Sequence, residues 1–456
     1  MNEPEKSGAS MPVNEGSCQH LLAQAQEHIE QLNKLLEIDQ ITGLPVRRAL
    51  ERVLCPKIDA GEAVALAIIR LDDRYRQRPM SSSFVAALLF SVGKRLSEMA
   101  PGQVFQSWRT DEYVMFLQEP TVLSDLEGFA ESIRETVERP VLDGPFHIRL
   151  GCNVGFALFP EHGSTVEELL TNAEIALGIV EQREARATVY QHEMGLRRRR
   201  QFEIEQAIGE AIQTGLSDFS LAFQPIVDRS GRLHGVEALM RWETSSLGVV
   251  PPGEFIPIAE QYGHIQLLGL WAIYHVATIA SGWRSTEYGE PIVTVNVSAM
   301  QLREPDFAVR AVELIRIAGA DPRRFRFELT ESVIVADPES ATRTLEVLKA
   351  EGVMLMIDDF GTGFSSFSYL HKLPIDTIKI AREFVEGVAG SESSRAVVRS
   401  IISVSHEIGG SVLAEGVETR EQFDVLLSEG CDFFQGYYFG RPRITERLEG
   451  LLDGSV

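Results

Sequence analysis

Short apolar runs alternate with helical segments over the second half of the chain, and this pattern constrains the fold more than any other feature. From about residue 218 there are about eight runs in roughly 230 residues, a number and spacing typical of an α/β barrel: LAFQPIV, GVEALMRW, IVTVNVS, RFRFELTE, VMLMIDD, DTIKIA, SVLAEGVE and DFFQGYYFG. Only DRSGRLH separates the first two runs, which is too short for a helical crossover. We therefore expect an α/β fold, a modified TIM-type barrel with an antiparallel first strand pair.

Each of these runs carries a polar side chain close to its end. The residues are Gln224, Glu237, Asn296, Glu328, Asp358 with Asp359, Lys379, Glu415 and Gln435. Because the carboxyl ends of barrel strands converge on one mouth, we expect these side chains to be neighbours. The carboxylates among them would repel one another unless hard cations lay between them, and Mg²⁺ or Mn²⁺ prefers oxygen ligands of this kind. With no His or Cys at these positions, zinc and copper are not expected.

The coincidence of polar residues at nearly every strand favours a functional site. A single acidic residue at a strand end is usually just solvated, whereas the whole set indicates a metal-assisted hydrolase. A lysine in the same mouth suits positioning or activating a water, or neutralising charge on a phosphoryl group. The alternative for Lys379 is a surface lysine that caps a helix, which its apolar context, DTIKIA, disfavours.

Composition limits the partners of the chain. Its 43 Lys and Arg against 66 Asp and Glu give a net charge of −23, which repels nucleic acid and anionic lipid surfaces. Any phosphate-bearing partner must then be met at a local site that contains cations. The four cysteines show no metal-ligand or disulfide spacing, and no apolar stretch approaches the roughly 20 residues of a membrane span. We expect a cytoplasmic protein with no nucleic-acid and no membrane partner.

The first half of the chain has a different organisation. Residues 1–16 have the composition of a disordered tail, and residues 17–38 carry a helical stripe, Leu22 to Leu36, that packs on its own domain or pairs two copies. A mixed α/β segment at 39–190 contains the strand-like runs AVALAIIRL, DEYVMFL and GCNVGFALF and the helical segment STVEELLTNAEIALGIV. Residues 191–205 form a charged helical linker, in which Arg197 to Arg200 are better interpreted as a solvated helix face than as a nucleic-acid patch.

Six motifs in the barrel region, taken in order, resemble the EAL domain, the family of cyclic di-GMP phosphodiesterases. They are EALMRW (237–242), VNVS (295–298), ELTES (328–332), DDFGTGFSS (358–366), AEGVET (414–419) and QGYYFG (435–440). We place this domain at residues 206–448. The resemblance implies hydrolysis of one phosphodiester bond of cyclic di-GMP to linear pGpG.

The same resemblance implies roles for individual residues. The implied metal ligands are Glu237, Asn296, Glu328 and Asp358, with Asp359 on a second Mg²⁺ or Mn²⁺. Lys379 and Glu415 would help to activate the nucleophilic water, and Glu331 would order the loop after Asp359. The dinucleotide or its neighbouring shell would be held by Gln224, Arg241 and Gln435.

Residues 39–190 resemble the GGDEF domain of diguanylate cyclases, through DQITGLPVRR (39–48) and FPEHGSTVEELLTNAEIAL (159–177). The signature loop, however, reads RTDEY at 109–113, with Arg109 and Thr110 in place of two glycines that let the backbone approach phosphates closely. Arg70 stands near the place of a metal-binding aspartate and would repel Mg²⁺. The Arg-x-x-Asp feedback site has no counterpart in EMAPGQVFQSW. We expect no diguanylate cyclase activity and a structural, dimerising or regulatory role; GTP binding as an allosteric signal is the alternative.

One departure from the EAL pattern leaves a second hypothesis open. The family usually has Lys-x-Asp where this chain has Lys379, Ile380 and Ala381, and losing that acidic group would weaken a second ion or lower the rate. The alternative function is a catalytically idle receptor that binds cyclic di-GMP and signals through the first domain. The complete set of implied ligands favours the enzyme. We also expect a homodimer, and a protein partner bound through the GGDEF domain or the N-terminal helix.

Overall fold

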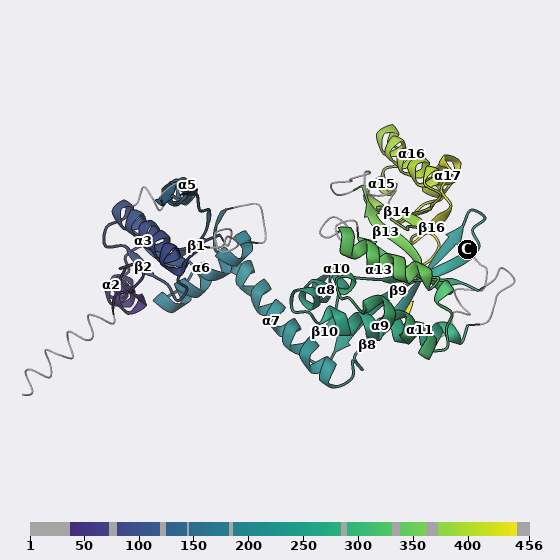
Figure 1. Ribbon diagram of the computed structural model, residues 1–456, viewed down its shortest axis with the longest axis horizontal. Helices are drawn as coiled ribbons and strands as arrows, with labels where there is room; N and C mark the ends of the chain where they lie inside the picture. Colours follow the sequence, from purple (N-terminus) through teal and green to yellow (C-terminus); the bar gives the residue numbers. More distant parts are fainter. Residues whose placement is uncertain are drawn as a thin grey trace, which may run out of the picture. The chain divides into compact units, whose positions relative to one another are not determined.

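The computed structural model describes residues 37–72, 80–118, 125–143, 146–181, 186–283, 290–330, 338–361 and 373–444. The predicted tail, the stripe from Leu22 to Leu36 and Glu331 lie outside these residues. The chain divides into two compact units, with the division after Arg200 (Figure 1). Within the described ranges, no helix is both long and apolar enough to cross a membrane.

The first unit is a mixed α/β domain built on a five-stranded sheet with strand order β2-β3-β1-β6-β7. Its elements, in chain order, are α2 (Arg47–Asp59), β1 (Val64–Leu71), α3 (Ser82–Met99), β2 (Val104–Gln106), β3 (Glu112–Leu117), α5 (Leu126–Glu138), β4 (Val141–Asp143), β5 (Phe146–Ile148), β6 (Cys152–Phe159), α6 (Val166–Glu181) and β7 (Ala187–Val189). The predicted strands are β1, β3 and β6, and the predicted helix is α6.

Both faces of this sheet are buried, because β1 alternates its side chains between two apolar clusters. Ala67 and Ile69 pack with α3 and α5, whereas Leu66 and Ile68 pack with α2 and α6. This explains why the run AVALAIIRL is apolar throughout: a central strand that is covered on both faces has no polar side to show.

The helical linker is longer than predicted. Helix α7 spans His192–Gln213, eight residues beyond the predicted end at 205. Ile204, Ala207 and Ile208 are buried in a cluster with the first barrel strands, so the apolar stripe extends the helix. Arg197 to Arg199 are exposed, which agrees with a solvated helix face.

The second unit is a barrel, and each of the predicted apolar runs forms one of the strands that close it. In the described part of the chain these are β8 (Phe219–Asp228), β9 (Leu233–Thr244), β11 (Ile292–Asn296), β12 (Phe325–Thr330), β13 (Met354–Phe360), β14 (Thr377–Ile380), β15 (Ser411–Ala414) and β16 (Phe433–Gln435). The predicted antiparallel hairpin of β8 and β9 is confirmed. β8 is also antiparallel to β16, while β9 and the strands from β11 to β16 run parallel.

Helices lie around the barrel strands (Figure 1). Phe325, Phe327 and Leu329 of β12 pack outward against α9, α11 and α13, so the alternate residue Glu328 faces the interior. The remaining elements are β10 (Gly248–Val250), α8 (Pro252–Gln261), α9 (Ile265–Ser281), α10 (Ala299–Leu302), α11 (Phe307–Ile317), the 3-10 helix Pro322–Arg324, α13 (Pro338–Ala350), α15 (Arg382–Glu386), α16 (Glu392–Glu407), α17 (Arg420–Glu429) and β17 (Arg443–Ile444).

Candidate metal and substrate site

Lys379 of β14 lies at the centre of the barrel mouth, with its side chain only 3% exposed. Its Nζ approaches four carboxylate oxygens: Glu328 Oε1 at 2.5 Å, Glu415 Oε2 at 2.9 Å, Asp358 Oδ1 at 3.4 Å and Glu237 Oε2 at 3.7 Å. Burial opposes the charge, but the surrounding carboxylates prevail and raise the pKa of Lys379 well above its usual value. The ammonium group therefore stays charged and joins acidic groups from four separate strands or strand ends.

Two amide side chains orient Glu237. Asn296 Nδ2 donates to Glu237 Oε1 at 2.8 Å, and Gln435 Nε2 donates to Glu237 Oε2 at 2.6 Å. Gln435 Nε2 also lies 3.1 Å from Gln224 Oε1, and Gln224 is the direct cross-strand partner of Glu237. The carboxylate is thus held by amides from β11 and β16, and Gln224 of β8 accepts from the second of these amides.

Glu328 has a buried oxygen that lacks a partner. The residue is 1% exposed, and its Oε2 accepts no hydrogen bond within the described ranges. Burial raises the pKa of Glu328 well above its usual value, although Lys379 opposes this shift. An unsatisfied buried carboxylate oxygen is costly, and a divalent cation is a partner that fits it. The all-oxygen donor set fits a hard ion such as Mg²⁺ or Mn²⁺.

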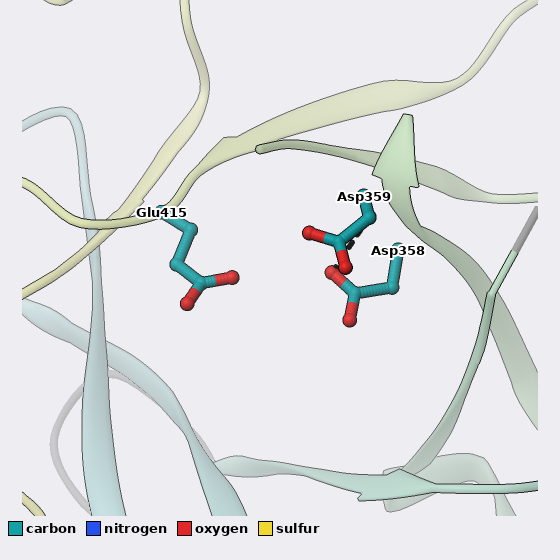
Figure 2. Close-up of side chains that lie close together, drawn as sticks. All are labelled: Asp358, Asp359 and Glu415. Atoms are coloured by element: carbon teal, nitrogen blue, oxygen red, sulfur yellow. Dashed lines mark hydrogen bonds between the residues drawn. The ribbon is translucent and has the colours of Figure 1, made fainter. Parts of the chain in front are cut away.

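A second group of carboxylates lies beside the first. One oxygen each of Asp358, Asp359 and Glu415 lies within 4.8 Å of the others. Figure 2 shows Glu415 directed across the mouth toward the two aspartates. Burial and the neighbouring Asp358 raise the pKa of Asp359, and burial raises the pKa of Glu415 against the opposing effect of Lys379. Asp358 belongs to both groups of carboxylates.

The backbone explains how two consecutive aspartates reach the same side. In a regular strand their side chains would point to opposite faces. The pairing of β13 with β14 shifts register between Ile357 and Phe360, and Asp359 has a φ of 51°. This irregularity turns Asp359 toward Asp358, and the backbone N–H of Asp359 donates to Asp358 Oδ1 at 2.8 Å.

Arg241 and Ala381 complete the predicted set. Arg241 lies four residues beyond Glu237 on β9, half-buried, with Nη1 donating to Met240 O at 2.8 Å. Burial lowers its pKa. Ala381 directly follows β14, is 2% exposed and precedes α15 without a side-chain cap. The predicted residues therefore come together in one mouth, apart from Glu331, which lies outside the described residues.

Two side chains near this mouth were not predicted. Tyr437 and Arg441 follow β16, and the guanidinium carbon of Arg441 lies 4.2 Å from the centre of the Tyr437 ring. The sequence QGYYFGR contains both residues. An aromatic run after a strand is, however, equally typical of core packing, so the sequence alone did not mark Tyr437 as a site residue.

In the first unit, the acidic residues of the signature loop are paired with arginines. Arg70 donates to Glu112 Oε2 from Nε at 2.8 Å and from Nη2 at 2.6 Å, because the two residues are direct partners on β1 and β3. Arg109 Nε lies 3.3 Å from Asp111 Oδ1. Glu112 and Asp111 are at most 1% exposed. The charge that a metal would neutralise is here balanced by arginine side chains.

Both halves of the chain match families of known proteins. Residues 205–442 match the family model described as EAL domain, and residues 36–186 match that of the diguanylate cyclase, GGDEF domain. The chain is 31% identical to the oxygen sensor protein DosP of Escherichia coli, over 95% of this chain and 54% of DosP. It is 30% identical to the cyclic di-GMP phosphodiesterase PdeR of E. coli, over 91% of this chain and 63% of PdeR.

A third relative is the bifunctional diguanylate cyclase/cyclic di-GMP phosphodiesterase MucR of Pseudomonas aeruginosa, 29% identical over 90% of this chain and 61% of MucR. The chain thus spans a little over half the length of these curated relatives.

Among solved structures, the PaMucR phosphodiesterase in complex with c-di-GMP superposes with a TM-score of 0.50 and 33% identity, covering 53% of this chain and 99% of that one. The EAL enzyme Bd1971, bound to cAMP and cyclic di-GMP, gives a TM-score of 0.51 and 30% identity, covering 55% of this chain and 69% of that one. The chain belongs to the EAL domain family, with a GGDEF domain preceding the barrel.

Proposed function

We propose that the barrel hydrolyses one phosphodiester bond of cyclic di-GMP to give linear pGpG, in a reaction that depends on Mg²⁺ or Mn²⁺. The observation that carries this proposal is the convergence of four carboxylates on Lys379, with Asn296 and the unsatisfied oxygen of Glu328 in the same mouth. The similarity to PdeR and to the c-di-GMP complex of PaMucR supports the same substrate.

The residues divide into two overlapping ligand sets. Glu237, Asn296, Glu328 and Asp358 would hold one ion, and Asp358 with Asp359 would hold a second, next to Glu415. Bound there, such ions lower the pKa of a water molecule and stabilise charge that develops on the phosphoryl group. The shared Asp358 would keep the two sites adjacent.

Glu415 would accept the proton of the attacking water, and Lys379 would supply positive charge beside it. The raised pKa of Glu415 suits a group that accepts a proton from the attacking water. Lys379 Nζ, 2.9 Å from Glu415 Oε2, would orient that carboxylate and supply a fixed, buried positive charge.

The remaining predicted residues would bind the dinucleotide or orient the metal ligands and the loop beside them. Arg241, near the end of β9, suits a phosphate oxygen of the dinucleotide. Gln224 and Gln435 contact Glu237 or each other, so we assign them to the shell that fixes the ligands. Glu331 is proposed to order the loop after Asp359.

We propose further that the GGDEF domain makes no cyclic di-GMP and regulates or scaffolds the barrel. The pairs Arg70–Glu112 and Arg109–Asp111 support this, because they balance the acidic groups a metal-bound GTP would require. Incubating the chain with GTP and Mg²⁺ tests the proposal, and any cyclic di-GMP or pGpG formed from GTP would contradict it.

The phosphodiesterase is tested with purified chain, cyclic di-GMP and Mg²⁺ or Mn²⁺, following pGpG. Glu237→Ala should abolish product, whereas Glu243→Ala, an exposed glutamate on the same strand, should not. The missing acidic group at Ala381 favours one second candidate, an idle receptor. Tight binding of cyclic di-GMP without formation of pGpG under either metal would contradict the phosphodiesterase and support the receptor.

A further inference from the structure

The turn after β16 presents one aromatic side chain outward and packs the next two, partly buried, against the core. Tyr437 is 48% exposed. Tyr438 and Phe439 instead pack on Phe423 of α17, with ring centres 6.3 and 5.4 Å away. Arg441 places its guanidinium carbon 4.2 Å from the centre of the Tyr437 ring. The core therefore does not require Tyr437, and the guanidinium group of Arg441 already lies over its ring.

A close backbone approach fixes this turn to the loop that follows β15. Val417 N donates to Gln435 O at 3.0 Å, and Tyr438 N donates to Val417 O at 3.0 Å. A Cβ on Gly436 would lie 2.0 Å from Val417 O, so only glycine permits this contact. The turn is thus held beside the loop that begins at Glu415.

The other side of the turn is tied to the first barrel strands. Gln224 Nε2 donates to Gly440 O at 3.2 Å. Gln224 Oε1 in turn lies 3.1 Å from Gln435 Nε2, which donates to Glu237 Oε2 at 2.6 Å. The turn that carries Tyr437 and Arg441 therefore lies beside the mouth that holds Glu237.

We propose that Tyr437, backed by Arg441, is a stacking platform for one guanine base of the substrate. This inference rests on the proposed hydrolysis of cyclic di-GMP. Aromatic rings and guanidinium planes are the usual partners of unpaired bases, since every base offers a π-face. An anchored platform at the rim holds one base while the attached phosphodiester reaches the carboxylates deeper in the mouth.

Steady-state kinetics with cyclic di-GMP and Mn²⁺ test the platform. Tyr437→Leu should raise KM about tenfold or more, because base stacking on an aromatic side chain is lost, while kcat changes less than twofold. Tyr437→Phe should restore the parent KM, since it keeps the ring. Arg441→Gln should raise KM by a smaller factor. Tyr274→Leu, a partly exposed tyrosine on the outer helix α9, is the matched control and should change neither constant.

Calorimetry with cyclic di-GMP in EDTA separates this inference from the proposed function. A parent chain that binds cyclic di-GMP in EDTA but forms no pGpG once Mg²⁺ or Mn²⁺ is supplied contradicts the phosphodiesterase, and the platform is then judged on Kd alone. A Tyr437→Leu chain with the parent KM and Kd overturns the platform, even where hydrolysis is intact. A Tyr437→Phe chain as impaired as Tyr437→Leu also overturns it, because the ring would then not be the binding element.

Discussion

Lys379 is buried against the carboxylates of Glu328 and Glu237, which are themselves buried, so its removal leaves buried negative charge uncompensated. We expect Lys379→Met to lower the free energy of unfolding by about 3 to 5 kcal/mol without divalent ions. Turnover of cyclic di-GMP should fall at least about a hundredfold, as for the loss of other fixed electrostatic groups. Mn²⁺ should recover part of the stability, because it binds only the folded site.

Urea unfolding in EDTA and in Mn²⁺ measures both effects on stability. The matched control is Lys349→Met: Lys349 Nζ lies 2.6 Å from Asp376 Oδ1, but both side chains are about one-third exposed. An ion pair of that kind contributes at most about 1 kcal/mol. Equal losses in the two variants would show that enclosure by the carboxylates is not what makes Lys379 important.

His234 gives the barrel a separate dependence on pH. Its ring stacks on Phe433 with centres 4.0 Å apart, and burial, assisted by Arg326, lowers its pKa from 6.5 to about 4. Because the folded-state pKa is the lower one, protonation favours the unfolded chain. The stability is complete above pH 6.5 and is lost as the pH falls toward 4.

We expect His234→Phe to remove this loss. Between pH 7.5 and 5 the parent should lose about 2 kcal/mol more than the variant, a figure that follows from about 1.4 kcal/mol per pKa unit. Urea unfolding at the two pH values measures the difference. Parallel stability profiles for parent and variant would contradict a buried neutral histidine.

Which site residues could be predicted from the sequence depended on their chemistry. Glu328 and Lys379 could be predicted as site residues because a charged side chain within or directly after an apolar run is unusual for a strand that only packs in a core. Tyr437 was missed because its neighbour Tyr438 has the same identity and packs on the core, and only the three-dimensional arrangement separates the two.

At the scale of elements, the end of β13 couples backbone conformation to ligand geometry. Asp359 has a φ of 51°, in the left-handed region that asparagine tolerates and β-branched residues do not. We expect Asp359→Asn to unfold within about 0.5 kcal/mol of the parent. Mn²⁺ affinity and turnover should nevertheless fall about tenfold or more, because one carboxylate of the trio with Asp358 and Glu415 is lost.

Calorimetry with Mn²⁺ and urea unfolding check this prediction. Asp359→Val is the informative comparison, since it removes the same charge and adds backbone strain of about 1 to 3 kcal/mol. Unchanged Mn²⁺ affinity in Asp359→Asn would remove Asp359 from the proposed ligand set.

Elements with one clear local signal were predicted well. The turn DRSGRLH was sufficient for the β8–β9 hairpin, because its length leaves no room for a crossover. The predicted end of the helical linker, residue 205, was wrong. Ile204, Ala207 and Ile208 form an apolar stripe that only the barrel can bury, and this stripe was not recognised in the sequence. The register shift in β13 has no sequence signal of its own, so the common orientation of Asp358 and Asp359 had to come from the structure.

At the scale of the whole chain, each unit has its own apolar clusters. Those of the first unit join β1 to α3 and α6, and those of the second join the barrel strands to their surrounding helices. A homodimer, a protein partner and the location in the cell stay predictions. What the structure adds is a contrast between two acidic sites, one with an unsatisfied carboxylate oxygen and one balanced by arginines.

This contrast predicts how ligands affect the stability of the intact chain. Scanning calorimetry should resolve two transitions, because each unit encloses a core of its own. Mn²⁺ and Mg²⁺ should raise only the barrel transition, since a ligand stabilises the unit that it binds. GTP with Mg²⁺ should raise neither, because Arg70 and Arg109 already pair with Glu112 and Asp111 of the signature loop. Glu328→Gln identifies the barrel transition by abolishing its shift with Mn²⁺, and a GTP-dependent rise of the other would mean that the GGDEF domain senses the nucleotide.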